Sequence, residues 1–498
     1  MQDQAAPQGT AGAGPSSLAD RHPSEGRASM NVAIEIDAVD AVVASARAAQ
    51  RGYEKSGSQA RYDRAALAAG WAIMEPSRNR ALAEMAVATT GLGNVADKVT
   101  KNHRKTLGLL RDIAGARTHG IVADDPARGV TEIARPLGVI AAVTPSTNPV
   151  ATPANNIINA LKCGNAIVLS PSPKGEACCA ALIEHIRAEF ARIDEDPLLV
   201  QMVPPPGSKA RTQRLLEVAD LAVVTGSQDN VRRAYSSGTP AIGVGAGNVS
   251  VIVDETADLE AAARRIAASK TFDNATSCSS ENAVIVVDAV YDAFVAALGR
   301  EGGAVLPASE APGIVERLWS DGHLDRHVIA RDAEVVIERL GLQGKVPEGT
   351  CFLAVETEGV GAGHPLSGEK LSLVLALYRA ADFDAARETA ARLLAHQGAG
   401  HSVGLHSADA ERPLLLGRTL PTCRVIVNQP HCFATGGSFE NGLPFSLSMG
   451  CGSWGGNSID ENLNWSHFMQ TTKVVRPIPA QEPALDAIFG GYWAEAGR

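Results

Sequence analysis

The sequence has few aromatic residues, 4% of its 498 positions, and no apolar run near the roughly 20 residues that cross a bilayer. The scarcity of aromatic side chains argues against an aromatic-rich binding surface, while abundant Ala and Gly favour close-packed layers of helix on sheet. No signal-peptide pattern opens the chain. We therefore expect a protein with no membrane association, located in the cytoplasm.

Clustered basic residues are also missing. The net charge is −10 and the isoelectric point is near 5.7, which argues against nucleic acid as a partner, because phosphate contacts need grouped Lys and Arg. The eight cysteines form no CxxC pair and show no regular spacing. This pattern predicts neither a metal site nor a disulfide framework, and it fits a reducing compartment.

What is present is an alternation of short apolar strands with helices, typical of parallel, doubly wound α/β sheets. Ala-rich helical segments are expected first, at 38–70 and 78–90, followed by another helix at 95–112. Strands at 120–123 and 129–135 suggest an exposed antiparallel hairpin, and 138–143 begins a sheet. The later strands are expected at 166–169, 199–203, 221–224, 241–244, 251–253, 283–287, 335–337, 352–355, 373–378, 402–405 and 425–427. A final strand is expected at 468–475, and the 498 residues suffice for two or three domains.

One cysteine stands out. Cys278 lies in Lys270-Thr-Phe-Asp-Asn-Ala-Thr-Ser-Cys-Ser-Ser-Glu-Asn282, between a predicted helix and the apolar run 283–287. A thiol among small polar side chains at such a junction can be exposed as a nucleophile. The alternative is a half-buried structural thiol.

A second candidate site follows a strand. Thr225-Gly226-Ser227 precedes a predicted helix at 229–237, where free backbone N–H groups suit a pyrophosphate. A simple Ser N-cap explains the same residues. The chain has no GxGxxG fingerprint at this point, so ordinary dinucleotide motifs would miss the domain.

Five separated motifs together resemble the aldehyde dehydrogenase family: 272–281, Thr144-Pro-Ser-Thr-Asn148-Pro149, Thr225-Gly-Ser227, Gly245-Ala-Gly247-Asn248 and Gly368-Glu369-Lys-Leu-Ser372. The resemblance covers nearly everything after about residue 35. The Asn-Pro pair and the ending Gly-Cys-Gly-Ser-Trp-Gly-Gly-Asn-Ser are similar to the CoA-acylating branch. Within that branch, 272–281 and 428–445 look like acylating sulfoacetaldehyde dehydrogenases.

The resemblance implies roles for individual residues. Cys278 would be the nucleophile, with the side-chain N–H of Asn148 and its own backbone N–H stabilising an oxyanion. An Asx-turn before Pro149 is the alternative for Asn148. The resemblance also implies a nicotinamide cofactor, with Glu369 accepting from ribose hydroxyls unless it is only a solvated surface carboxylate. The other expected cofactor-binding residues are Thr144, Pro145, Thr225, Gly226, Ser227 and Gly245.

In many members of the family, a Lys follows the strand that corresponds to 166–169 and holds the adenine ribose of the cofactor. In this chain that Lys is replaced or displaced. Here the strand is followed by Ser170-Pro-Ser172-Pro-Lys174, and no obvious carboxylate stands there to repel a 2′-phosphate. We therefore expect NAD(P)+ as cofactor, with a slight preference for NADP+. No metal is expected.

The most informative absence is a carboxylate. Hydrolytic relatives carry a Glu that activates water, whereas the equivalent segment here is Val244-Gly-Ala-Gly-Asn248. Water, with a pKa of about 15.7, needs a base or metal, but a thiol with a pKa of about 8.5 does not. This favours CoA as acyl acceptor. Two other carboxylates, Glu281 and Glu440, are candidates for restoring hydrolysis.

The substrate is expected to be a small aldehyde, best matched by sulfoacetaldehyde, with acetaldehyde, propionaldehyde or succinate semialdehyde as alternatives. Candidate substrate or CoA residues are His401, Asn428, Gln429, His431, Thr435 and Ser438. A hydrolytic semialdehyde dehydrogenase and a non-catalytic scaffold remain as other hypotheses.

The expected division of the chain follows from the family. A disordered tail covers 1–30. A cofactor-binding domain takes 31–117 and 138–243, and a catalytic domain takes 244–465. Residues 118–137 and 466–480 form an oligomerisation element, implying a homodimer or homotetramer, and 481–498 form a C-terminal extension.

Overall fold

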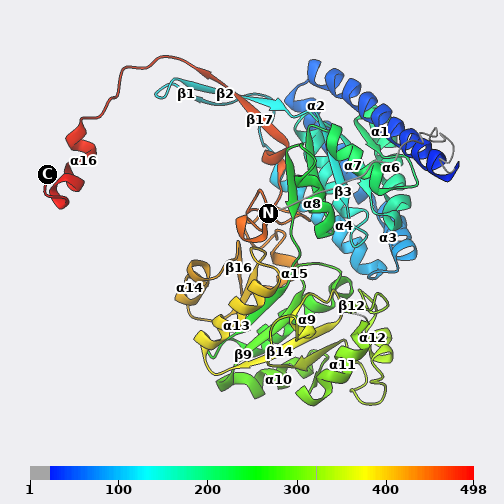
Figure 1. Ribbon diagram of the computed structural model, residues 1–498, viewed down its shortest axis with the longest axis vertical. Helices are drawn as coiled ribbons and strands as arrows, with labels where there is room; N and C mark the ends of the chain where they lie inside the picture. Colours follow the sequence, from blue (N-terminus) through cyan, green and yellow to red (C-terminus); the bar gives the residue numbers. More distant parts are fainter. Residues whose placement is uncertain (1–22, 321) are drawn as a thin grey trace, which may run out of the picture.

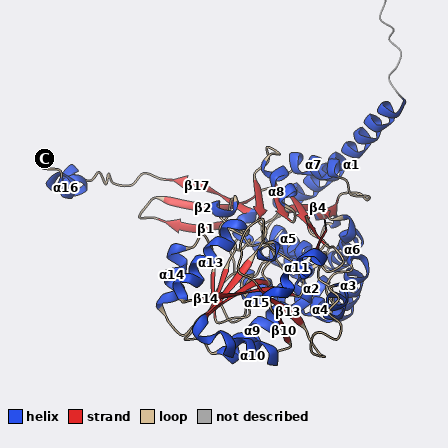
Figure 2. Ribbon diagram, turned by 60° about the horizontal axis from the view of Figure 1, so that its bottom comes forward, coloured by secondary structure: helices blue, strands red, loops and turns tan. Residues whose placement is uncertain are grey.

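The computed structural model describes residues 23–320 and 322–498 (Figure 1). Two α/β lobes lie one above the other, and a three-stranded arm projects from them (Figures 1 and 2). The predicted α/β fold with parallel sheets is confirmed. None of the helices in the described part is both apolar and long enough to cross a membrane.

The first lobe is built on a five-stranded parallel sheet in the order β5-β4-β3-β6-β7. Its central strands are buried on both faces, which explains their continuous apolar runs. The strands are β3 (Val139–Thr144), β4 (Ala166–Pro171), β5 (Val200–Met202), β6 (Leu221–Thr225) and β7 (Ala241–Val244). The helices of this lobe are α1 (Pro23–Lys55), α2 (Gln59–Met74), α3 (Pro76–Thr90), α4 (Val95–Ile113), α5 (Ala151–Lys162), α6 (Glu176–Arg192), α7 (Lys209–Val218) and α8 (Gln228–Tyr235).

Local sequence signals set the boundaries of the first helices. Ser58 accepts a hydrogen bond from the backbone N–H of Arg61 and starts α2, so the helix expected over 38–70 is two helices. Pro76 occupies the first position of α3, where its missing N–H costs nothing. Helix α1 begins at Pro23, so the predicted tail is wrong for residues 23–30, and residues 1–22 lie outside the described part.

The second lobe contains a seven-stranded parallel sheet in the order β10-β13-β14-β9-β8-β15-β16. Helices α9 and α10 contribute to the core on one face, and α11, α13 and α14 contribute to the core on the other. The strands are β8 (Val249–Val253), β9 (Glu281–Val287), β10 (Gly303–Leu306), β13 (Phe352–Glu356), β14 (Val374–Ala380), β15 (Val403–His406) and β16 (Val425–Val427). The helices are α9 (Leu259–Thr271), α10 (Tyr291–Arg300), α11 (Ala311–Leu318), α12 (Ala333–Arg339), α13 (Phe383–His396), α14 (Glu411–Thr419) and α15 (His431–Ala434).

The arm is an antiparallel sheet of β1 (Gly120–Asp125), β2 (Val130–Pro136) and β17 (Met469–Val475). The predicted hairpin and the terminal strand are confirmed, and they pair with each other across most of the chain length. Beyond β17 the chain runs away from both lobes and ends in α16 (Leu485–Glu495), far from the body of the molecule (Figures 1 and 2).

One predicted strand is wrong. Residues 335–337 belong to α12, in which only Val336 is buried and faces the second lobe's core. Three apolar residues in a row fit one helical turn as well as a strand, and length decides between them. The elements that were not expected are helices α5, α11, α14, α15 and α16, strand β10 and the two-residue strands β11 (Trp319–Ser320) and β12 (His323–Leu324).

Candidate active site

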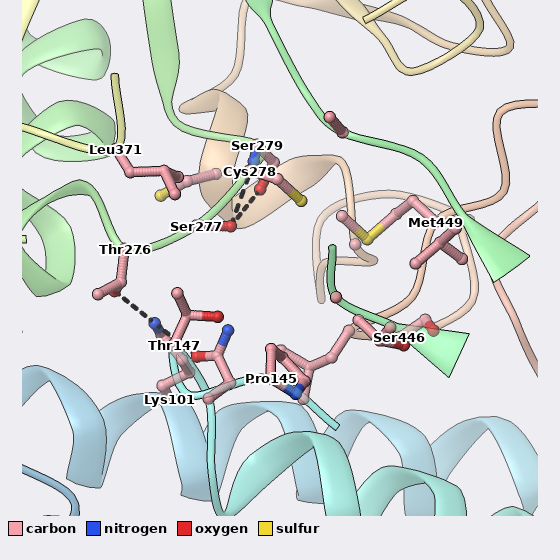
Figure 3. A pocket seen from close by; sticks show the side chains of 18 of the residues that line it. Lys101, Pro145, Thr147, Thr276, Ser277, Cys278, Ser279, Leu371, Ser446 and Met449 are labelled. Atoms are coloured by element: carbon pink, nitrogen blue, oxygen red, sulfur yellow. Dashed lines mark hydrogen bonds between the residues drawn. The ribbon is translucent and has the colours of Figure 1, made fainter. Parts of the chain in front are cut away.

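A cavity of about 350 Å³ is lined by residues from both lobes. Strands β3, β6 and β7 bring their carboxyl ends to it, where parallel sheets bind ligands. The loop before β9 brings Cys278 to the same cavity. Figure 3 shows Cys278 across the cavity from Pro145 and Thr147, with Met449 at one side.

The loop that carries Cys278 has an unusual backbone. Asp273, Asn274 and Ala275 follow one another with φ of 49°, 53° and 60°, which is the left-handed region. Each non-glycine residue there costs roughly 1–2 kcal/mol, and only Asn and Asp adopt it with any frequency. Surrounding contacts must therefore hold this turn in place, and the turn fixes where Cys278 enters the cavity.

Asp273 supplies most of those contacts. Its fully buried carboxylate accepts from Lys101 and, over 3.1 Å, from Lys98, and its backbone N–H donates to Asp97 over 2.8 Å. Burial alone would raise the pKa of this carboxyl. The positive charges of Lys101 and Lys98 outweigh burial and keep the pKa below its usual value. Gly93 leaves the space that the Asp273 carboxylate occupies, since a Cβ at residue 93 would lie 1.8 Å from Asp273 Oδ1.

Asn148 is held by the same network. Lys101 Nζ donates to Asn148 Oδ1 over 3.0 Å. It also donates to Thr276 Oγ1 over 3.2 Å (Figure 3). An ammonium group can only donate, so it fixes which end of the amide is the acceptor. The Asn148 NH₂ is thereby left as a donor beside the cavity that also contains Cys278. This arrangement suits an oxyanion formed on that sulfur.

Cys278 is half-buried, and burial raises the pKa of its thiol to about 12. Glu369 and Cys451 add to the increase, while Arg424 opposes it. The resting nucleophile is therefore a thiol, and it becomes more reactive with positive charge nearby.

Gly247 is required by the position of Cys278. A Cβ at residue 247 would lie 2.0 Å from the carbonyl oxygen of Cys278, so no side chain fits.

The neighbouring Val244, Gly245 and Ala246 line the cavity without contributing a carboxylate. The two other candidate bases do not line it. Glu281 is buried at the start of β9, where burial raises its pKa to about 7, and Glu440 is exposed.

Several cavity residues fit a nicotinamide cofactor. Glu369 lies on the cavity wall, and its Oε1 is buried without a hydrogen-bond partner among the described residues. Burial raises the pKa of this carboxyl to about 8. Thr144, at the end of β3, lies behind the cavity lining, next to Pro145 in the chain, and its Oγ1 is buried without a partner among the described residues. These acceptors and hydroxyls match the ribose and amide groups of such a cofactor.

Residues 225–227 have two functions in the fold. Ser227 caps α8 through a 3.4 Å bond from Asn230 N, as the simpler interpretation expected. All three residues also line the cavity together with Pro145 and Gly245. Thr225 Oγ1 lies 2.5 Å from Ser448 Oγ, which ties this edge to the second lobe.

The residues expected to bind the adenine end of the cofactor are Ser170, Ser172 and Lys174. They lie at the end of β4, outside the lining of this cavity. Ser170 Oγ is 2.8 Å from Thr212 Oγ1 and is buried. Ser172 Oγ is buried without a partner among the described residues, and Lys174 is exposed. A hydroxyl without a protein partner and an exposed ammonium two residues further along the chain suit a phosphate group.

Comparison with known proteins decides the family. The family model described as "Aldehyde dehydrogenase family" matches residues 11–304, more than half of the chain. The chain belongs to the aldehyde dehydrogenase family. An acylating sulfoacetaldehyde dehydrogenase from Cupriavidus necator is 57% identical over 462 residues, which is 93% of this chain and 94% of that protein.

Solved structures agree. An acetylating aldehyde dehydrogenase from Geobacillus thermoglucosidasius superposes with a TM-score of 0.86 at 32% identity, covering 91% of this chain and 99% of that one. A propionaldehyde dehydrogenase from Rhodopseudomonas palustris was solved with bound CoA and an acylated cysteine. It superposes with a TM-score of 0.76 at 25% identity, covering 88% of this chain and 97% of that one. The predicted resemblance to the CoA-acylating aldehyde dehydrogenases is confirmed.

The expected substrate or CoA residues of this aldehyde dehydrogenase lie elsewhere. His401, Asn428, His431 and Thr435 are not among the residues lining the cavity. Ser402 Oγ lies 2.8 Å from a ring nitrogen of His401 and 2.8 Å from one of His431, and both rings are buried. The Asn428 side chain bonds the backbone of residue 407, and Thr435 Oγ1 donates to the His431 carbonyl. Their roles in binding stay predictions.

Among the cavity residues that the sequence analysis missed are the basic residues of α4, Lys101, Arg104 and Lys105. Charged residues on a helix usually indicate a solvated face. In α4, however, Lys101 and Lys105 are buried, whereas Leu107 is 41% exposed. The signal was the spacing of Lys98, Lys101 and Lys105, which places three lysines on one side of a helix.

Proposed function

We propose that this aldehyde dehydrogenase oxidises sulfoacetaldehyde with NAD(P)+ and CoA, giving sulfoacetyl-CoA. One observation carries the proposal. Cys278 and Asn148 share a cavity in which Glu369 is the only lining carboxyl among the described residues, so this lining holds a nucleophile and an oxyanion donor without a dedicated base for water. The name of the relative from Cupriavidus necator supports the choice of aldehyde.

The first step is the attack of the Cys278 sulfur on the aldehyde carbon, which forms a thiohemiacetal. Its oxygen carries negative charge, and the Asn148 amide N–H stabilises that charge because Lys101 already occupies the amide oxygen. A bound oxidised nicotinamide cofactor supplies the hydride acceptor needed to convert this adduct to a thioester. Glu369, Thr144 and residues 225–227 would hold that cofactor.

The second step transfers the acyl group from Cys278 to CoA. A thiol with a pKa of about 8.5 is already a few per cent thiolate near neutrality and attacks a thioester without a strong base. Water needs activation, and the wall at Val244, Gly245 and Ala246 offers none. The absence of that carboxylate protects the thioester against hydrolysis.

For the cofactor, we propose a slight preference for NADP+. Ser172 Oγ and the exposed Lys174 are available at the end of β4 for a 2′-phosphate, with Ser170 supporting them through Thr212. Comparison of kcat/KM for NADP+ and NAD+ in wild type and in Lys174→Ala tests this. A ratio unchanged by the substitution would contradict the assignment.

We further propose a cytoplasmic homodimer or homotetramer assembled through the arm, which comprises 118–137 and 466–480. Residues 31–117 and 138–243 would form the cofactor-binding domain and 244–465 the catalytic domain. The arm projects from both lobes, and β17 is largely exposed (Figure 1). An exposed edge strand is a ready site for pairing with a second copy. Sedimentation would show a single monomer if this is wrong.

A panel of small aldehydes with CoA and each cofactor tests the function. Sulfoacetaldehyde should give the highest kcat/KM, above acetaldehyde, propionaldehyde and succinate semialdehyde, and acyl-CoA should be the product. Cys278→Ala should fold normally and be inactive. An active Ala variant would rule out the assignment of the nucleophile.

A further inference from the structure

The cavity wall formed by α4 is strongly cationic. Lys101, Arg104 and Lys105 lie at helical spacings of three and four residues, so they share one face. Within the part of the chain that the structure describes, Glu369 is the only carboxyl that lines the same cavity. Lys101 is neutralised by Asp273, but neither Arg104 nor Lys105 forms an ion pair with any carboxylate of the described residues.

Lys105 is buried and only partly satisfied. Its Nζ donates to the carbonyl oxygen of Gly436 over 2.6 Å and lies 5.6 Å from the ring centre of Phe445. An ammonium group has three N–H donors, so two remain for a ligand. The lack of a side chain at Gly436 leaves room for this lysine, since a Cβ at residue 436 would lie 2.7 Å from Lys105 Nζ.

Arg104 is held in place beside it. Its guanidinium lies 4.9 Å from the ring centre of Phe433 and donates to Ser438 Oγ over 3.0 Å. A stacked guanidinium keeps its fork of donors in a fixed plane, which suits an anion with several oxygens. Phe433 and Gly436 come from the segment around α15, so the two cations are positioned by both lobes.

The charge of this wall is unbalanced. Burial lowers the pKa of Lys105 to about 7, and repulsion from Arg104 and Lys101 adds to the effect. Cys432 and Cys278 oppose this lowering of the Lys105 pKa. Lys105 and Cys278 line the same cavity. Burying cations without partners is costly, and a bound anion removes that cost.

We propose that Lys105 and Arg104 form a subsite for the negatively charged end of the substrate, a short aldehyde that ends in a sulfonate or carboxylate. The inference rests on the proposed function and deepens it. With the charged end on this wall, the aldehyde end points toward Cys278 and Asn148. The same cations explain selection of a charged aldehyde over a neutral one.

Kinetics with matched aldehydes test the subsite. The variants are Lys105→Met and Arg104→Met, with Arg111→Met as control, since Arg111 lies on the same helix outside the cavity lining. The ratio of kcat/KM for sulfoacetaldehyde to that for propionaldehyde should fall about 10- to 100-fold in each test variant, the usual cost of a lost charged hydrogen bond. Arg111→Met should leave the ratio unchanged. Succinate semialdehyde in place of sulfoacetaldehyde separates carboxylate from sulfonate recognition.

Three kinetic outcomes would overturn the proposal. An equal loss for charged and neutral aldehydes would mean that these side chains only support the cavity. An unchanged ratio with a raised KM for CoA would assign the cations to the CoA phosphates. A ratio unchanged in both variants, or changed as much in Arg111→Met, would remove the subsite altogether.

A second measurement does not depend on catalysis. Ethanesulfonate is unreactive and can be titrated into wild type and variants by calorimetry. Wild type should bind it, and Lys105→Met and Arg104→Met should weaken binding about 10-fold or more. No binding to wild type would overturn the subsite. Binding without CoA-dependent turnover of any aldehyde would refute the proposed function and leave the anion subsite intact.

Discussion

Lys101 Nζ donates a hydrogen bond to Asn148 Oδ1 over 3.0 Å, and the same ammonium group pairs with the buried carboxylate of Asp273. One lysine thus connects the turn that presents Cys278 with the amide that would stabilise the oxyanion. The nucleophile and the donor are positioned by a common buried network. Lys101 is therefore a positioning residue in this account.

Lys101→Met should lower kcat by about 10- to 100-fold, somewhat less than the 10²–10³ expected for removing the donor itself in Asn148→Ala. The reason is that the amide can then rotate and lose its orientation. Measurement of kcat and of the KM for CoA checks this, and the KM for CoA should change little. In the double variant the two effects should add only in part, because Lys101 acts through Asn148 as well as through Asp273. Fully additive effects would contradict the linkage between Lys101 and Asn148.

Gly247→Ala should abolish most activity while the protein remains folded. The new Cβ would lie 2.0 Å from the carbonyl oxygen of Cys278, so the Cys278 loop must move. Gly299→Ala is the matched control, since a Cβ there meets no atom within 4 Å. Activity and circular dichroism of both variants provide the measurement. Near-normal activity of Gly247→Ala would show that the loop tolerates displacement.

Alkylation of Cys278 in the cofactor-free enzyme should be slow at neutral pH. Because the pKa of this thiol is raised to about 12, the thiolate fraction grows about tenfold for each pH unit from 7 to 10. Iodoacetamide labelling followed by peptide mass spectrometry measures the rate, with exposed Cys351 as internal comparison. A rate for Cys278 that levels off below pH 9 would contradict the raised pKa.

Binding of the charged aldehyde should weaken as the pH rises. The lowered pKa of Lys105 means that it is charged below about pH 7 and neutral above it, so an anion binds less well at higher pH. The ratio of kcat/KM for sulfoacetaldehyde to that for propionaldehyde should therefore fall between pH 6 and 8. A ratio independent of pH in this range would count against Lys105 as the anion ligand.

Most strands could be predicted because both large sheets are parallel and buried, which leaves continuous apolar runs such as those of β3 and β9. The nucleophile was found for a different reason. Cys278 stands among small polar residues just before an apolar strand, and local composition is visible in a sequence. The prediction of a strand at residues 335–337 was wrong because three apolar residues in a row fit one helical turn as well as a short strand.

The network around the nucleophile could not be predicted. Asp273, Lys98 and Lys101 are brought together from α4 and the turn before Cys278, and their burial exists only in the tertiary structure. The left-handed turn at residues 273–275 has only the Asp-Asn pair as a local signal. Arg104 and Lys105 were overlooked for the same reason, since charged helix residues ordinarily face solvent.

The central claim is that the thioester on Cys278 is transferred to CoA and not to water. The most direct measurement is rapid-mixing observation of reduced cofactor formed from sulfoacetaldehyde, with and without CoA. Without CoA, we predict a burst of about one equivalent per active site and then almost no turnover, while CoA restores steady turnover with acyl-CoA as product. Sustained turnover without CoA, releasing the free acid, would contradict the account.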